Sequence, residues 1–229
     1  MVSPHNDNEQ LSLVVAGHVD HGKSTVIGRL LADTGNLPEG RLAEVRARCQ
    51  RTARPFEYAF LVDALKDEQA QGITIDSARC FFKTARRRYI LIDAPGHIEF
   101  LRNMITGAAR AEAALVVIDA REGIRENTKR HGFLVSMLDI HQVAVLVNKM
   151  DLAGYDRDRF DRIRAEYGAF LEELGVPGAV FVPISAFQGV NLTAPSPEQT
   201  PWYTGPTVLE LIDGFHRREE QVDLPLRLP

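Results

Sequence analysis

The chain has 229 residues, of which 45% are hydrophobic, and a formal net charge of −4. This composition supports a real core, excludes wholesale disorder and gives no global basic field of the kind that indicates nucleic acid. Two cysteines, Cys49 and Cys80, are too few for a disulfide framework, and no apolar run approaches the roughly 18 residues of a membrane span. We expect a cytoplasmic domain without a membrane partner, with both cysteines as inert packing or surface residues.

Apolar runs alternate with helix-like stretches along most of the chain. The runs predict buried strands at 11–16, 89–92, 113–118, 143–147 and 180–184. The stretches predict helices that open at 25–31 and lie at about 99–110, 126–139, 157–174 and 207–220. Because the runs are apolar at nearly every position, the strands are expected to be covered on both faces. The pattern predicts an α/β fold with a doubly wound, mostly parallel sheet flanked by helices.

Two parts of the chain depart from this alternation. Residues 77–84 predict an additional strand, which a solvated turn at 85–88 joins to the next strand. Residues 34–72 contain an arginine-rich helix-like segment, followed by a second segment at 56–65 whose apolar residues have helical spacing. We expect the apolar stripe of that second segment to pack against the domain.

A phosphate-binding motif lies between the first predicted strand and the first predicted helix. Its residues are Gly17, His18, Val19, Asp20, His21, Gly22, Lys23, Ser24 and Thr25. The glycines let backbone N–H groups curve around a phosphate, Lys23 neutralises phosphate charge and Ser24 offers its hydroxyl to Mg²⁺. His18 and His21 suggest a metal pair, but such a loop turns its backbone toward the ligand, so loop scaffolding is the better interpretation.

Two further motifs supply candidate ligands for the phosphates and the metal. Asp93 and Gly96 form a DxxG motif, in which the carboxylate holds Mg²⁺ through water and the glycine N–H donates to a γ-phosphate. Thr74 lies in the segment 72–75, which also suits the start of a strand. A threonine there coordinates Mg²⁺ only while the γ-phosphate is present, which makes its loop a switch. The predicted metal ligands are Ser24, Thr74 and Asp93.

The base-reading motif follows the strand at 143–147 and consists of Asn148, Lys149, Met150 and Asp151. The Asp151 carboxylate accepts hydrogen bonds from the ring N–H and the exocyclic amine of guanine, an arrangement that adenine lacks. Lys149 would lay its methylene stem along the base, and Ser185 with Ala186 would offer a backbone N–H to guanine O6. A capped helix start explains an isolated NKxD motif, but all the motifs together in chain order predict GTP and GDP as ligands.

Residues 17–25, GITID at 72–76, DAPGH at 93–97 and NKMD at 148–151 together resemble the translation-factor class of GTPases. The resemblance covers about residues 11–220 and implies a P-loop GTPase domain. In that family the histidine after DxPG orients the attacking water, which assigns this role to His97, with Lys23 and Thr74 as the other catalytic residues. Val19 and Ile73 would form an apolar gate that His97 must pass.

The resemblance also implies a division of the chain. A disordered tail at 1–10 precedes a GTP-binding domain at 11–220, which contains a long switch region at 34–76. Residues 221–229 would begin a linker to β-barrel domains that this chain does not contain, because both closest branches of the family carry such barrels and use them to bind partners.

Those two branches differ in what GTP hydrolysis drives. One is the GTPase subunit of bacterial sulfate adenylyltransferase (ATP sulfurylase), which assists adenylylsulfate synthesis by an adenylyltransferase catalytic subunit in sulfate assimilation. The other is the elongation factor that delivers aminoacyl-tRNA to the ribosome. Residues 27–31, 33–34, 129–131 and 184–186 resemble the sulfurylase subunit, whereas His18, His21, Ala94 and 103–107 resemble or favour the elongation factor. The sequence favours the sulfurylase subunit, with the elongation factor as the alternative.

Overall fold

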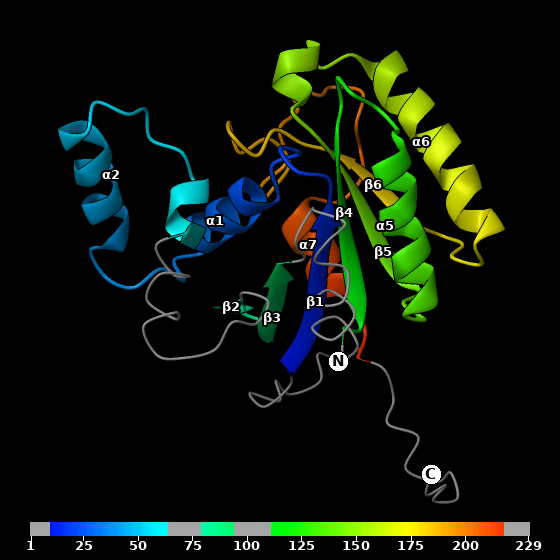
Figure 1. The fold of residues 1–229 in the computed structure, drawn as a ribbon, viewed down its shortest axis with the longest axis horizontal. Coiled ribbons are helices and arrows are strands. Elements are labelled where there is room, and N and C mark those ends of the chain that lie inside the picture. Colours follow the sequence, from blue (N-terminus) through cyan, green and yellow to red (C-terminus); the bar gives the residue numbers. More distant parts are fainter. Residues whose placement is uncertain (1–9, 64–78, 94–110, 218–229) are drawn as a thin grey trace, which may run out of the picture.

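The structure is a computed structural model that describes residues 10–63, 79–93 and 111–217. In these ranges six strands form one sheet in the order β2-β3-β1-β4-β5-β6 (Figure 1). The strands are β1 (Gln10–Gly17), β2 (Arg79–Lys83), β3 (Arg88–Asp93), β4 (Ala113–Asp119), β5 (Gln142–Asn148) and β6 (Val180–Pro183). Of these, β2 pairs antiparallel with β3, and all the other pairs are parallel. The predicted α/β fold with a mostly parallel sheet is confirmed.

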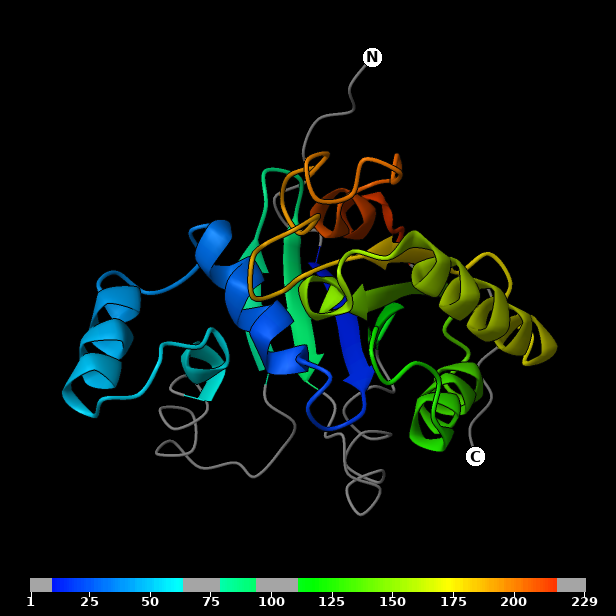
Figure 2. The ribbon, with the colours of Figure 1, turned by 90° about the horizontal axis from the view of Figure 1, so that it is seen from above.

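Helices cover both faces of the sheet. Their bounds are α1 (Lys23–Asp33), α2 (Arg41–Arg51), α5 (Glu126–Met137), α6 (Arg157–Glu173) and α7 (Val208–Gly214), with a 3₁₀ helix η2 at Met150–Ala153. A further helical turn begins at Ala59. Figures 1 and 2 show α5 and α6 together on one side of the sheet, and α1 and α7 belong to the opposite side.

The alternation of side chains along each strand produces these two layers. On β1, Leu11, Leu13 and Val15 pack with α1 and α7, whereas Val14 and Ala16 pack with α5 and α6. All five side chains are buried. Because both faces of the strand are covered, nearly every position is apolar, which is why the strands appear in the sequence as continuous apolar runs.

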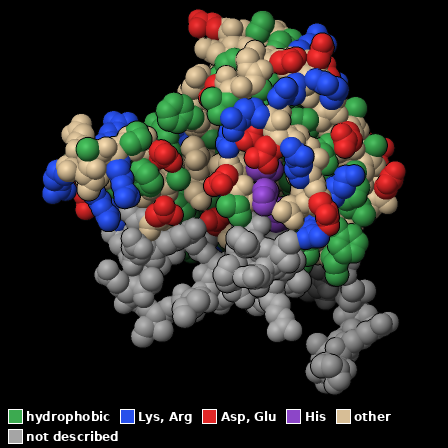
Figure 3. Space-filling model, turned by 45° about the horizontal axis from the view of Figure 1, so that its top comes forward, with side chains coloured by type: hydrophobic (Ala, Val, Ile, Leu, Met, Phe, Trp, Pro, Cys, Tyr) green, Lys and Arg blue, Asp and Glu red, His purple; other side chains and the backbone are tan. Residues whose placement is uncertain are grey.

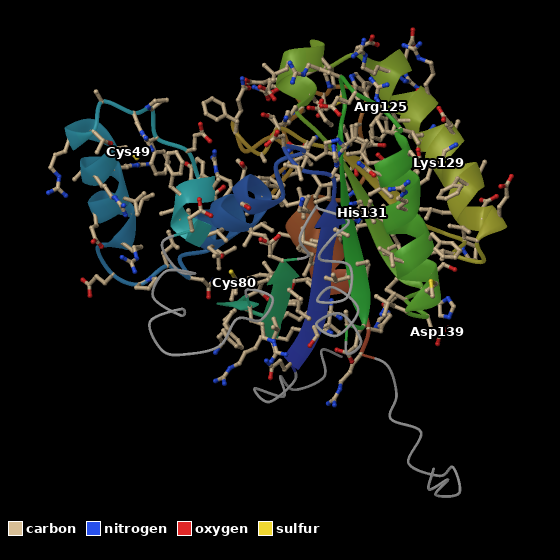
Figure 4. All side chains as sticks on the ribbon, in the orientation of Figure 1. Cys49, Cys80, Arg125, Lys129, His131 and Asp139 are labelled. Atoms are coloured by element: carbon tan, nitrogen blue, oxygen red, sulfur yellow. The ribbon has the colours of Figure 1, made fainter. Side chains whose placement is uncertain are left out.

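Helix α2 lies outside these two layers. Val45 and Cys49 on α2 pack with Leu61 in a small separate cluster. Both ribbon views place α2 at one edge of the molecule, away from the sheet (Figures 1 and 2). The arginine-rich helix is therefore present as predicted. Cys49 on α2 and Cys80 on β2 are both buried, as their expected packing role requires (Figure 4).

Two expectations about the fold need correction. Helix α7 ends at Gly214 rather than at residue 220, because Phe215 adopts an extended backbone and buries its side chain in the core. The turn at 85–88 is only partly solvated, since Arg87 is buried and Arg88 already belongs to β3. The predicted helix at 99–110 lies outside the described residues, and the proposed division of the chain remains a prediction.

One finding concerns membranes. Among the helices of the described ranges, none combines the length and the apolar character that a passage through a bilayer requires.

Candidate nucleotide-binding site

The sequence motifs meet at the carboxyl edge of the sheet. The parallel strands β1, β3, β4 and β5 end there, at Gly17, Asp93, Asp119 and Asn148. Strand pairing places Gly17 beside Val117 and Asp119 beside Asn148. Strand β1 lies between β3 and β4, so the connections on its two sides diverge at this point of the sheet. Open α/β sheets bind ligands at such a topological switch point.

The loop after β1 has a backbone that requires glycine at both ends. Gly17 and Gly22 have positive φ angles of 152° and 90°. A Cβ atom on Gly17 would lie 2.5 Å from the Val117 carbonyl oxygen, and one on Gly22 would lie 2.5 Å from Asn148 Nδ2. Lys23 opens α1 directly after the loop and donates from Nζ to the Gly17 carbonyl at 2.7 Å. Glycine backbone, ammonium and helix N-terminus thus converge as a phosphate site requires.

His21 belongs to the scaffold of this loop. Its ring is fully buried, with Nδ1 at 3.1 Å from the Val117 carbonyl oxygen and Nε2 at 3.4 Å from the Glu122 carboxylate. Burial lowers the pKa of His21, although its bonds to Val117 and Glu122 act against this shift. His18 meets the His21 ring edge-on and lies 3.2 Å from Asn127 Nδ2. This geometry agrees with scaffolding, and no group of three or more His, Cys, Asp or Glu suited to a metal occurs in the described part of the chain.

A third histidine lies near the loop, and sequence reasoning gave it no role there. His131 on α5 is buried, and its Nδ1 has no hydrogen-bond partner among the described residues (Figure 4). Burial, together with the charge of Lys23 and the neighbouring His18 and His21, lowers the pKa of His131 to about 4. The imidazole is therefore neutral near pH 7. His131 lies near the loop because α5 packs beside β1 and β4, a tertiary contact that no local sequence pattern indicates.

Asn148 connects the phosphate loop to the loop after β6. Its Nδ2 donates to the His21 carbonyl at 2.8 Å, and its Oδ1 accepts the Ala186 N–H at 2.9 Å. Asn148 is buried, so both bonds form away from water and hold the two loops in one fixed relation. In this structure the Ala186 N–H donates to Asn148. The expected bond from the loop after β6 to guanine O6 stays a prediction.

Lys149 forms an ion pair with Asp119, a residue that belongs to none of the sequence motifs. Its backbone is left-handed, with φ of 61°, and its Nζ lies 2.9 Å from Oδ2 of the buried Asp119. Burial acts to raise the pKa of Asp119, but Lys149 and the Arg121 N–H outweigh it, so this pKa lies below its ordinary value. The ion pair fixes the head of Lys149 and leaves its methylene stem as a surface against which a base can lie.

A cavity of about 290 Å³ lies between these groups. Its lining comprises Gly22 and Thr25 of the phosphate loop, Asn148 at the end of β5, Lys149, Asp151 and Leu152 after β5, Ala186 and Phe187 after β6, and Glu57. The structure therefore brings the predicted base reader Asp151 into one cavity with the phosphate loop. Phe187 is 62% exposed and offers a flat apolar face there. Sequence reasoning missed both Phe187 and Glu57, although the position of Phe187 directly after Ala186 was a usable signal.

Ser24 and Asp93, two of the three predicted metal ligands, lie at the same edge of the sheet. Ser24 is the second residue of α1, and Asp93 ends β3 beside Val15 of β1. Hydroxyl and carboxylate oxygens are the donors that Mg²⁺ prefers, so this donor set fits the metal. The other predicted phosphate, metal and gate residues, Ile73, Thr74, Gly96 and His97, lie outside the described residues.

The remaining predicted residues belong to the same two loops. Asp20 has a left-handed backbone with φ of 64°, and Val19 is partly exposed. Ser185 is buried, and its Oγ accepts the Gln188 N–H at 3.1 Å, which shapes the loop after β6.

Figure 3 shows acidic, basic and histidine side chains mixed on the face turned to the viewer, without a field of one sign.

This fold and its phosphate loop define a P-loop nucleotide-binding domain. The sequence profile of the family described as the elongation factor Tu GTP binding domain matches residues 8–218. The chain belongs to this family and is a GTP-binding domain of the translational GTPase class.

Relatives with known names agree with that membership. Elongation factor 1-alpha of Methanosphaerula palustris is 44% identical over 227 residues, which cover 98% of this chain and 53% of the relative. The factor of the same name from Pyrococcus furiosus is 44% identical over 223 residues, which cover 97% and 52%. The chain thus spans about half the length of the curated relatives it matches.

Solved structures give the same picture. The structure of sup35 complexed with GMPPNP aligns with a TM-score of 0.65 and 28% identity, over 92% of this chain and 46% of that one. The S. cerevisiae Ski7 GTPase-like domain bound to GTP aligns with a TM-score of 0.72 over 89% and 48%. At 23% identity the second likeness shows the fold alone.

Proposed function

We propose that this chain is the GTP-binding domain of an elongation-factor-type GTPase, which binds GTP and GDP with Mg²⁺ and hydrolyses GTP. The observation that carries the proposal is the single cavity shared by the phosphate loop and Asp151. In a longer protein of this type, the domain would switch the delivery of aminoacyl-tRNA to the ribosome. The named relatives, at 44% identity over nearly the whole chain, support this choice.

The elongation-factor reading replaces the sulfurylase reading that the local sequence features favoured. Several of those features have roles in packing that do not depend on the partner. Asp33 pairs with Arg29 on α1, His131 is buried near the phosphate loop, and the Ala186 N–H serves Asn148. Such contacts stabilise the domain in either branch, so they do not discriminate between them. An adenylyltransferase partner therefore loses its place as the leading expectation.

The proposed mechanism assigns each step to a group of this chain. Lys23 and the N-terminus of α1 bind the phosphates, and Ser24 and Asp93 would hold Mg²⁺, which neutralises charge on the β- and γ-phosphates when bound. Asp151 selects guanine. Thr74 as the switch ligand and His97 as the residue that orients water complete the proposal; a His97→Ala variant should keep GTP affinity and lose most hydrolysis.

Calorimetry with the purified chain tests nucleotide choice. GDP and GTP should bind, whereas ADP and ATP should bind at least about 100-fold more weakly, because the Asp151 carboxylate would meet no donor on adenine. Equal affinity for ADP and GDP would contradict the proposal.

The partner is tested on the longer protein. GTP hydrolysis should rise when ribosomes programmed with messenger RNA and aminoacyl-tRNA are added. It should not respond to a bacterial adenylyltransferase with ATP and sulfate. Stimulation by the adenylyltransferase and not by ribosomes would overturn the elongation-factor assignment and restore the sulfurylase subunit.

A further inference from the structure

One residue in the lining of the nucleotide cavity belongs to none of the motifs. Glu57 lies between α2 and the helical turn that begins at Ala59, in a segment distant in sequence from every other part of the lining. Its side chain is exposed. Within the described residues the Glu57 carboxylate makes no hydrogen bond or ion pair, and Lys149, the cation of the same cavity, is paired with Asp119. As far as the described residues are concerned, the Glu57 carboxylate keeps its full capacity to accept hydrogen bonds from a ligand.

The segment that carries Glu57 is fixed against α1. A Cβ atom on Gly28 would lie 2.1 Å from the Tyr58 carbonyl oxygen, so the backbone beside Glu57 touches the helix directly. The Arg29 guanidinium lies over the Tyr58 ring, 4.6 Å from its centroid, and donates from Nη1 to the Phe187 carbonyl at 2.9 Å. One arginine thus contacts the neighbour of Glu57 and the wall of the base pocket. This contact joins the segment that carries Glu57 to the wall of the cavity at Phe187.

The chemistry of a guanine nucleotide leaves one suitable partner for this carboxylate. The phosphates are anions and repel it. The donor edge of guanine is read by Asp151 under the proposed function. The ribose lies between base and phosphates, and its two hydroxyl groups are neutral donors that a carboxylate binds well. A carboxylate that reads ribose hydroxyls is also the solution used by dinucleotide-binding folds.

We propose that Glu57 accepts a hydrogen bond from a ribose hydroxyl of the bound guanine nucleotide and thereby favours nucleotides whose ribose carries its 2′- and 3′-hydroxyl groups. The inference rests on the proposed function, because it requires a guanine nucleotide in the cavity. It adds a specificity-determining residue from outside the phosphate and base motifs.

The test compares GDP with 2′,3′-dideoxy-GDP by calorimetry on the whole chain, with unlabelled nucleotides so that no dye occupies the ribose. The unmodified chain should bind GDP about tenfold more tightly, the effect of one hydrogen bond to a charged group. In Glu57→Ala the GDP affinity should fall by about that factor while the dideoxy affinity stays unchanged, so the ratio approaches one. Glu57→Gln, which keeps an acceptor oxygen without the charge, should lie between the two.

Glu39→Gln is the matched control, because Glu39 is an exposed carboxylate just before α2 and lines a separate groove beside that helix. In Glu39→Gln the ratio of GDP affinity to 2′,3′-dideoxy-GDP affinity should equal that of the unmodified chain. If Glu57→Ala weakens the binding of GDP and of the dideoxy analogue equally, or weakens neither, the inference is overturned while the proposed function stands. If the unmodified chain does not bind GDP, the proposed function fails and the inference fails with it.

Discussion

The phosphate loop and the α2 segment, residues 41–63, contribute to one cavity, the second through Glu57, but they are held in place by different forces. The loop is tied by buried polar contacts, since Asn148 bonds both His21 and Ala186 between the ends of the strands. The α2 segment rests on a small apolar cluster of its own and on contacts with α1 at Gly28 and Arg29.

The difference indicates how one site combines selectivity with response. Buried, fully paired polar networks are rigid, so the edge of the sheet keeps its geometry whether or not a ligand is present. A satellite cluster has few buried contacts and opens at a lower free energy than the core. We therefore expect base recognition to be preformed, and the segment that carries Glu57 to open at a lower free energy than the strands behind the base pocket.

The largest effect is expected from Asn148→Ala, which breaks the rigid region. The substitution leaves the His21 carbonyl and the Ala186 N–H buried without a partner, so the free energy of unfolding should fall by about 3 kcal/mol. GDP affinity should fall about 100-fold, because the two loops lose their fixed relation. Chemical denaturation and calorimetry measure these changes. Asn127→Ala, which removes the bond to His18 at the rim, is the control; equal losses in both variants would contradict the central role of Asn148.

Gly28→Ala tests the attachment of the α2 segment. Replacing glycine by alanine in a helix normally raises the free energy of unfolding by about 1 kcal/mol. Here the new Cβ would meet the Tyr58 backbone, so we expect the free energy of unfolding to fall by about 2 kcal/mol. Hydrogen exchange should increase at 54–63 and not in β5. Gly168→Ala on α6 is the matched control, since its Cβ would meet only the Phe181 ring at an ordinary 3.8 Å and should stabilise the chain. Stabilisation by Gly28→Ala would refute the close attachment.

His131 makes the rigid region sensitive to acid. Its pKa of about 4 lies below its ordinary value of 6.5, so the unfolded chain binds the proton more readily. Its contribution to stability is complete above pH 6.5 and is lost as the pH falls toward 4. Between pH 7 and pH 5 this amounts to about 2 kcal/mol.

His131→Gln should flatten the decline of the unfolding free energy over that range, measured by urea denaturation at each pH. His141→Gln, at an exposed histidine after α5, should leave the decline unchanged. An unaltered slope in His131→Gln would show that the proton is bound elsewhere.

The smallest effect is expected from Arg29→Gln, at the junction of the two regions. It removes the contact with the Tyr58 ring and the bond to the Phe187 carbonyl, each worth about 1 kcal/mol or less at a partly exposed site. GDP affinity should fall a few-fold in calorimetry. Arg29 also pairs with Asp33 on α1, and Arg130 forms a comparable pair with Glu126 on α5. Arg130→Gln should leave the GDP affinity unchanged. An equal loss of GDP affinity in both variants would mean that Arg29 acts only through its charge.

The sequence predicted what short-range pattern determines. The strands, the phosphate loop and the base motif are each contiguous, and their types follow from apolar periodicity and from the spacing of glycine, lysine and aspartate. The carboxyl ends of parallel strands share one edge, so the meeting of Gly22, Asn148 and Asp151 was predictable as well.

The residues that sequence reasoning missed depend on tertiary packing. Asp119 ends a strand without any motif, and only the pairing of β4 with β5 brings it to Lys149. Glu57 reaches the cavity because Gly28 lets a distant segment approach α1. Arg87 is buried in a hairpin whose Thr84 and Tyr89 donate hydrogen bonds to Asp213 on α7, a contact that a run of three arginines does not reveal.

A calorimetric comparison of GDP with xanthosine diphosphate tests whether Asp151 reads guanine in this cavity. Xanthine carries a carbonyl oxygen where guanine carries the amine, so it requires a donor where the Asp151 carboxylate only accepts. The unmodified chain should prefer GDP, and Asp151→Asn should lose about 100-fold or more in GDP affinity and prefer the xanthine nucleotide. Retention of full GDP affinity by Asp151→Asn would contradict the account.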